Sequence, residues 1–215
     1  MTFSDLYSGY IVPGSTLLPI GAGVIYYKKL GKAIHTLIIY LGIALLINIA
    51  GIIMAAHNKN NLPLLHLYTA FELVAVVWYY KWAFSVPLVN KWSRVIMIVY
   101  PILCVINFIF FQSIYKFNTY TRPLEAIIII AFSGIYLSNQ HRLSHKELTA
   151  SAGRWVASGF LLYFCSSLFQ FIFSNVVSKH ASRDVKLLIW NIHDTFVMIM
   201  YIIFFIGIQR ERSER

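Results

Sequence analysis

The stretch NLPLLHLYTAFELVAVVWYYK, residues 61–81, decides the fold class of this 215-residue chain. Apart from His66 and Glu72, every side chain in 62–80 is apolar, aromatic or the small Thr69. A soluble amphipathic helix needs one polar face, whereas a helix that crosses a membrane needs about 20 mostly apolar residues. The stretch therefore predicts a membrane-spanning helix with an ionisable carboxyl, Glu72, near its midpoint.

The carboxyl of Glu72 is the first side chain that needs an explanation. Placing such a group at bilayer depth costs roughly 2.5 to 3.5 kcal/mol on insertion scales, so it persists where it faces protein or a water-filled cavity. We expect Glu72 to be protonated at this depth unless a cation, a metal or an imidazolium lies beside it.

The composition of the whole chain agrees with this interpretation. Hydrophobic residues make up 59% of the chain and charged residues 12%, which is typical of a polytopic membrane protein. The net charge of +10 comes from basic residues between apolar runs and forms no continuous stripe, so nucleic acid is not an expected partner. Cys104 and Cys165 lie inside apolar runs and predict neither a disulfide framework nor a metal cluster.

The apolar runs predict an all-α chain that forms one domain over residues 1–215, a compact bundle of seven transmembrane helices. Seven stretches are long enough to cross a bilayer: about 7–27, 33–55, 62–80, 94–112, 122–138, 155–177 and 186–208. The first has no basic region ahead of it, so we expect a retained helix and not a cleaved signal peptide. Pro13 and Pro19 predict that this helix is irregular. Short connections predict that consecutive helices are antiparallel neighbours.

The distribution of Lys and Arg predicts the orientation. With the N-terminus outside, twelve basic residues lie on the cytoplasmic side and six on the outer side. The cytoplasmic group is Lys28, Lys29, Lys32, Lys81, Lys91, Arg94, Arg142, Lys146, Arg154, Arg210, Arg212 and Arg215, and the outer group is Lys59, Lys116, Arg122, Lys179, Arg183 and Lys186. The positive-inside rule then favours an outer N-terminus and an inner C-terminus.

With this orientation, most of the polar residues within the spans fall in the outer half of the bundle. Asn191, His193 and Asp194 lie roughly 8 to 12 Å below the outer boundary at 1.5 Å of rise per residue. The inner halves carry few polar groups, so the sequence predicts an outward-facing polar cup above an apolar floor. The predicted ligand-binding residues are Glu72, Asp194, His193, Asn191, His66 and Gln170, with Arg122 and Glu125 at the rim.

Other interpretations of these residues remain open at this stage. Polar side chains within spans often hydrogen-bond between helices without binding a ligand, and Arg122 with Glu125 could be a local ion pair on one helical face. His66, Glu72, His193 and Asp194 are residue types that bind zinc or iron. His66 and Glu72 are six residues apart, however, which turns them about 120° from one another, and the i, i+4 histidine pair of a zincin is missing.

The segments LHLYTAFELVAVVWYY, YTRPLEAIIIIAFSGIYLS and LLIWNIHDTFVMIMYIIFFIGI resemble small uncharacterised seven-helix membrane proteins of Bacteroidetes-type bacteria. In pattern the chain is also similar to the seven-helix sensor modules that bacteria couple to histidine kinases. That resemblance implies a cytoplasmic signalling partner, since we expect no kinase domain in this chain.

The first functional interpretation is an integral protein of the bacterial inner membrane that binds a small or amphipathic ligand, a small molecule or a lipid, as a receptor or sensory subunit. It needs no cofactor and no metal. The second interpretation is a membrane-embedded metal-dependent lipid hydrolase that uses His66, Glu72, His193 and Asp194. The third is a small transporter.

Overall fold

The computed structural model describes residues 3–84, 86–139 and 152–214, and every regular element in these ranges is a helix. Seven helical segments within them are long and apolar enough to cross a membrane, which confirms the predicted number. After the first segment, the long helices are α4 (Lys32–Ala56), α5 (Leu62–Ala83), α6 (Pro87–Ile106), α7 (Thr121–Ser138), α8 (Gly153–His180) and α9 (Arg183–Glu214). A π-helical turn, η3 (Asn107–Phe111), extends α6.

The first segment is irregular, as its prolines predicted. It consists of α1 (Phe3–Leu6), the π-helical turn η1 (Tyr7–Ile11), α2 (Val12–Ser15) and α3 (Leu17–Ile25), followed by a short 3-10 turn, η2 (Tyr27–Lys29). Pro13 has no N–H for the carbonyl four residues earlier, so the regular hydrogen-bond ladder cannot continue through it.

Two helices extend well beyond the predicted membrane spans. α6 begins at Pro87, seven residues before the predicted Arg94, because the polar residues of its first turns lower the hydropathy without breaking the helix. Proline is also well suited to a first helical position. α9 continues to Glu214, past the predicted end at 208.

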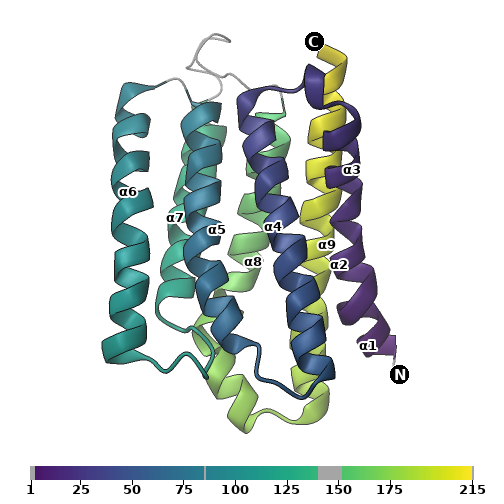
Figure 1. Ribbon diagram of the computed structural model, residues 1–215, viewed down its shortest axis with the longest axis vertical. Helices are drawn as coiled ribbons and strands as arrows, with labels where there is room; N and C mark the ends of the chain where they lie inside the picture. The colour runs from purple at the N-terminus through teal and green to yellow at the C-terminus, as the bar shows by residue number, and fades with distance from the viewer. Residues whose placement is uncertain (1–2, 85, 140–151, 215) are drawn as a thin grey trace.

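Five of the long helices and α3 form a closed ring, and α6 lies outside it (Figure 1). α3 packs against α4 and α9, α4 against α5, α5 against α7, α7 against α8, and α8 against α9. α6 packs mainly on α5 and reaches α7 through Tyr100, whose hydroxyl donates to the Thr121 carbonyl at 2.9 Å. The expectation that all consecutive helices are close neighbours therefore fails between α6 and α7. The two termini lie at opposite ends of the bundle.

Aromatic rings fill the half of the bundle nearer the C-terminus. The ring of Phe160 in α8 lies 4.8 Å from Phe204, 6.2 Å from Tyr79 and 6.3 Å from Tyr80, measured between centroids. The hydroxyls of Tyr80 and Ser133 are hydrogen-bonded at 2.7 Å. The sequence predicted an apolar floor on one side of the polar residues, and this half contains the hydrogen-bonded hydroxyls of Tyr80 and Ser133 as well as aromatic and apolar side chains.

A buried carboxyl at the C-terminal end of the bundle joins three segments. Glu211 of α9 is fully buried and accepts hydrogen bonds from the Gly31 amide at 2.9 Å and the Ala152 amide at 3.3 Å. α9 is thereby tied to the residues that precede α4 and α8.

Candidate functional site

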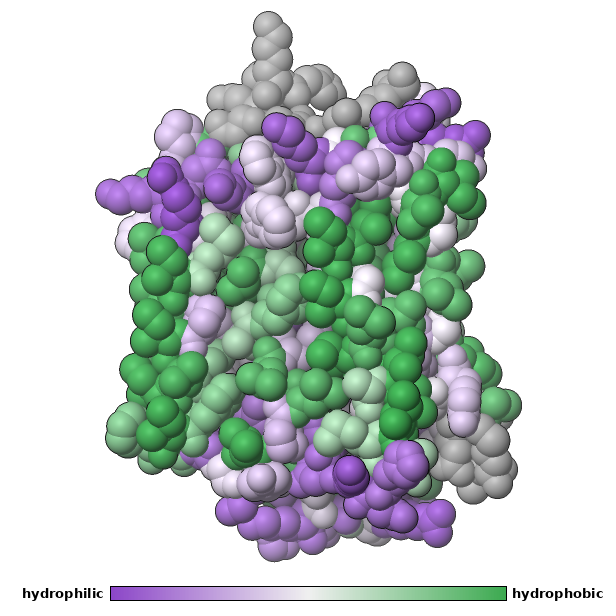
Figure 2. Space-filling model, viewed as in Figure 1, coloured by the Kyte–Doolittle hydropathy of each residue, from purple (hydrophilic) through white to green (hydrophobic). Residues whose placement is uncertain are grey.

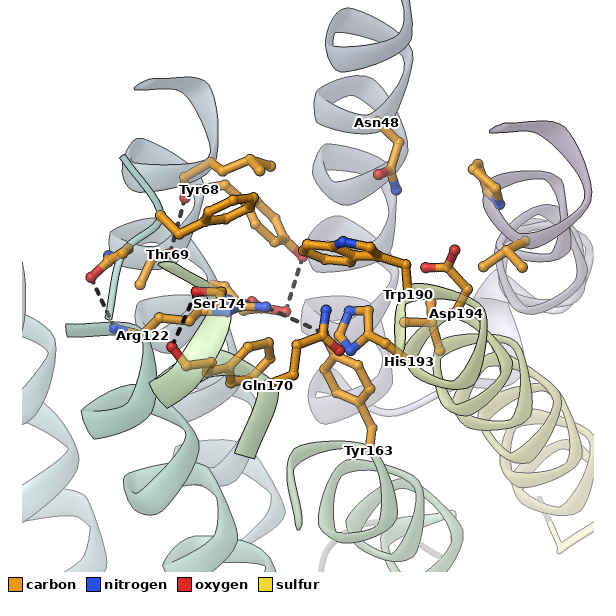
Figure 3. Close-up of a pocket in the computed structure, with 18 of the residues that line it drawn as sticks. Asn48, Tyr68, Thr69, Arg122, Tyr163, Gln170, Ser174, Trp190, His193 and Asp194 are labelled. Carbon is orange, nitrogen blue, oxygen red and sulfur yellow. Dashed lines mark hydrogen bonds and ion pairs between the residues drawn. The ribbon is translucent and has the colours of Figure 1, made fainter. Parts of the chain in front are cut away.

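A cavity of about 240 Å³ lies between the helices in the half of the bundle nearer the N-terminus (Figure 3). Side chains of the first segment, α4, α5, α7, α8 and α9 line it, together with Phe117 and Asn118 from the loop that precedes α7. Six of the eight predicted ligand-binding residues are among them: His66, Glu72, Arg122, Gln170, His193 and Asp194.

One face of α9 supplies a wall of the cavity. Trp190, His193 and Asp194 occupy positions i, i+3 and i+4, so they share one helical face and point into the cavity in Figure 3. The same face continues through Val197 and Tyr201.

A chain of polar contacts crosses four helices at the cavity. The Tyr40 hydroxyl of α4 and the Tyr68 hydroxyl of α5 donate to Glu72 Oε1 at 2.7 and 3.0 Å. Arg122 of α7 donates through Nη1 to Glu72 Oε2, and through Nη2 to the Tyr163 hydroxyl of α8 at 3.3 Å. Glu72 is 2% exposed, so its carboxylate is buried and has both a cation and two hydroxyl donors beside it. Arg122 is therefore the neighbouring cation that the sequence interpretation allowed for.

Arg122 also contacts a second carboxylate. Its Nη1 donates to Glu125 Oε2 at 2.8 Å, and its guanidinium lies 4.5 Å from the centroid of the Phe171 ring. The predicted local ion pair of Arg122 and Glu125 thus exists, with Glu72 as a third member. This group of charges lies inside the bundle. Glu125 is 0% exposed, which corrects its expected place at the rim.

The loop formed by residues 112–120 explains why Arg122 lies so deep. The Asn175 side chain of α8 accepts from the Phe117 amide at 3.1 Å and donates to the Phe117 carbonyl at 2.9 Å. His66 Nε2 bonds the Lys116 carbonyl at 2.8 Å, and the rings of Phe117 and Trp190 lie 5.6 Å apart. These contacts draw the loop inward over the cavity, so α7 starts inside the bundle.

Two buried polar atoms at the cavity wall have no hydrogen-bond partner in the described part of the chain. They are Gln170 Nε2 and His66 Nδ1, on side chains that are 7% and 1% exposed. Buried polar groups are nearly always hydrogen-bonded, so these two atoms lack a partner that the described residues do not supply. His193, by contrast, uses its Nδ1 in a 2.9 Å hydrogen bond with the Ser167 hydroxyl.

Asn191 and Glu125, the other two predicted ligand residues, do not line the cavity. The side-chain carbonyl of Asn191 accepts from the hydroxyls of Ser4 at 2.8 Å and Ser8 at 3.3 Å. Asn191 therefore joins α9 to the first segment, and Glu125 lies behind Arg122. Both serve contacts between or within helices, which is the plain alternative for polar residues in spans.

The four side chains considered as metal ligands are not arranged as a ligand set. Within residues 3–84, 86–139 and 152–214, no group of three or more His, Cys, Asp or Glu side chains is placed to hold a metal ion. Both carboxylate oxygens of Glu72 are already engaged by Arg122, Tyr40 and Tyr68. His66 and His193 each direct one ring nitrogen to a neutral partner.

The sequence interpretation missed the aromatic residues of the site, among them Tyr40, Tyr68, Tyr163 and Trp190. A usable signal was present for Tyr40 and Tyr163, which lie well inside their spans and away from the aromatic belt at the membrane boundary. A buried tyrosine hydroxyl usually needs a hydrogen-bond partner, so such a position points to a polar neighbour.

Comparison with known proteins found no matching family model, curated protein or solved structure. The resemblance to small seven-helix membrane proteins of Bacteroidetes-type bacteria therefore stays a prediction.

Proposed function

We propose that this chain is an integral protein of the bacterial inner membrane that binds a small ligand in the cavity between its helices and acts as a receptor or sensory subunit. The chain crosses the membrane seven times, with its N-terminus outside and its C-terminus in the cytoplasm. The observation that carries the proposal is the cavity itself, with its buried ion pair and two unpaired polar atoms.

The distribution of side chains on the surface supports insertion in a bilayer. Figure 2 shows a broad apolar band around the middle of the visible face, with hydrophilic residues gathered at both ends. Large apolar side chains such as Leu46, Ile98 and Phe110 are exposed at 65%, 65% and 73%. Apolar exposure on this scale is unfavourable in water and favourable against lipid tails.

The basic residues support the orientation. Arg122 is paired inside the bundle, which leaves five of the six basic residues assigned to the outer side. Of the twelve assigned to the cytoplasmic side, Arg142, Lys146 and Arg215 lie outside the described residues. Without Arg122, the number of basic residues assigned to the cytoplasmic side exceeds the number assigned to the outer side by a larger margin, which strengthens the positive-inside assignment.

The closed aromatic half favours binding over transport. Rings around Phe160 fill the bundle on the cytoplasmic side of the cavity, so a ligand that enters from outside meets a packed floor. The occupied carboxylate of Glu72 favours binding over metal-dependent hydrolysis, because its oxygens serve Arg122 and two tyrosines. A sensory role requires a cytoplasmic signalling partner.

Cysteine labelling in intact cells tests the orientation. In a background without Cys104 and Cys165, Lys59→Cys should react with a membrane-impermeant maleimide, and Lys28→Cys should react only after lysis. Both lysines are exposed and lie in connections at opposite ends of the bundle. The reverse pattern would refute the proposed topology.

Filling the cavity tests ligand binding. Asn48 lines the cavity and Leu46, two residues away on the same helix, is exposed on the outer surface. The small-molecule fraction of a bacterial extract should raise the melting temperature of the wild-type protein and of Leu46→Phe. It should leave Asn48→Phe unchanged, because the added ring occupies ligand space. Equal shifts in both variants, or no shift in the wild type, would contradict the proposal.

A further inference from the structure

The charges around the cavity do not balance. Three carboxyls, those of Glu72, Glu125 and Asp194, lie at or behind its wall, and Arg122 is the one guanidinium or ammonium group among its lining residues. Arg122 forms ion pairs with Glu72 and with Glu125, and Asp194 belongs to neither pair. Asp194 thus brings a carboxyl to the cavity without a cation from the described residues.

The two histidines do not supply the missing charge. In the described residues neither His66 nor His193 forms an ion pair with a carboxyl, and each has one ring nitrogen bonded to a neutral oxygen. The Ser8 hydroxyl lies beside Asp194, and it is neutral as well. An isolated carboxylate in a membrane interior is costly, so a positive group from a ligand would gain from its presence.

We propose that the ligand of this cavity is a small protonated organic amine, whose ammonium group binds the Asp194 carboxylate and whose remaining atoms lie against Trp190. This inference rests on the proposed function, since it names the chemical class of the ligand at the same site.

The walls of the cavity suit an organic cation better than an inorganic one. Hard cations such as calcium and magnesium take several oxygen ligands, and the described residues hold no such cluster of acidic groups. Trp190 lies one helical turn before Asp194, next to the rings of Phe117 at 5.6 Å and His193 at 6.1 Å between centroids. Aromatic faces attract ammonium groups, and tryptophan does so most strongly.

Two further residues that line the cavity, Gln170 and His66, carry unpaired atoms and add a second requirement. Gln170 Nε2 can donate a hydrogen bond, and His66 Nδ1 can accept one when its Nε2 donates to the Lys116 carbonyl. A ligand hydroxyl that reaches either side chain would give its unpaired atom a partner. A 150 Å³ cavity holds benzene, so a volume of about 240 Å³ accepts a somewhat larger molecule.

Three probes of nearly equal size separate charge from shape. Tyramine carries an ammonium group, tyrosol a neutral hydroxyl and 4-hydroxyphenylacetate a carboxylate on the same phenol framework. We expect tyramine to raise the melting temperature of the purified protein and to quench tryptophan fluorescence in a saturable way. Tyrosol should bind at least about tenfold more weakly, because it lacks the charge-assisted hydrogen bond, and 4-hydroxyphenylacetate should not bind.

Matched variants locate the interaction. Asp194→Asn keeps the shape of the side chain and should weaken tyramine binding at least about tenfold while leaving tyrosol binding unchanged. Asp184→Asn, at the exposed start of the same helix, should change neither. The comparison of the three probes on the wild-type protein does not depend on whether Asp194→Asn folds.

The inference is overturned if tyrosol binds as tightly as tyramine, if 4-hydroxyphenylacetate binds most tightly, or if tyramine does not bind. It is also overturned if Asp194→Asn and Asp184→Asn respond alike. None of these results contradicts ligand binding in the cavity by itself. The proposed function still holds if the bacterial extract raises the melting temperature of Leu46→Phe and does not raise that of Asn48→Phe. If that test fails as well, the cavity is not a ligand site.

Discussion

In the half of the bundle that holds the N-terminus, the helices surround a cavity and a buried arginine, whereas in the other half the same helices meet through aromatic rings around Phe160. The cavity does not arise because its walls are made of small side chains, since the large residues Tyr163, Phe171 and Trp190 line it. The difference lies in the kind of contact. Ion pairs and hydrogen bonds require specific distances and directions, while apolar rings pack in many arrangements.

The polar chain from Tyr40 through Glu72 and Arg122 to Tyr163 marks the boundary between the two halves. It joins α4, α5, α7 and α8, and the Tyr40 ring lies 6.0 Å from Phe160 on the aromatic side. Closing the cavity would require these helices to move, which would break contacts to buried charges. The polar chain therefore holds open the space above it, and the aromatic half supplies the rigid base.

Replacing Arg122 should have the largest effect, because it removes the cation from two buried carboxyls. We expect Arg122→Leu to lower the free energy of unfolding by about 3 to 5 kcal/mol, measured by chemical denaturation in detergent. Arg94→Leu is the matched control: Arg94 is exposed on α6, and its loss should change stability by no more than about 0.5 kcal/mol.

The state of Glu72 is tested by the same measurement. Glu72→Gln keeps the size of the side chain but removes the charge opposite Arg122, so it should destabilise the protein almost as much as Glu72→Ala. If Glu72→Gln and Arg122→Leu are both well tolerated, the pair is not a buried ion pair and the contrast between the two halves loses its basis.

The sequence predicted the helices well and the depth of the site less well. Seven apolar runs near 20 residues can satisfy their backbone groups in a membrane only as helices, so their number and approximate bounds follow from local sequence. The face of α9 is equally local, since Trp190, His193 and Asp194 are spaced to lie together. The prediction failed for Asn191, which follows Trp190 directly and therefore points to another neighbour, the first segment.

The position of Arg122 could not be predicted from its own neighbourhood. It begins an apolar run, so sequence alone placed it at the membrane boundary. Its depth depends on Asn175 and His66, which lie 53 and 56 positions away along the chain and draw the preceding loop inward. Tertiary contacts of this kind leave no periodic pattern near the residue that they place.

A smaller effect on stability is expected from a substitution in the aromatic half. A Cβ added to Gly159 of α8 would lie 2.8 Å from Phe204 Cε1 and 3.4 Å from Ile203 Cγ2, so a side chain of α9 must shift. Overpacking typically costs about 1 to 3 kcal/mol, and the better helix propensity of alanine offsets up to about 1 kcal/mol of this. We therefore expect Gly159→Ala to lower the free energy of unfolding modestly.

Gly134 of α7 is the matched control, because a Cβ there would meet nothing within 4 Å. Gly134→Ala should be neutral or stabilising by about 0.4 to 1 kcal/mol. In a Phe204→Leu background the cost of Gly159→Ala should fall, since the ring that it meets is gone, and unfolding of the four proteins measures this coupling. If Gly159→Ala proves as mild as Gly134→Ala, the aromatic half has free space too, and the cavity above it no longer needs the polar chain as its cause.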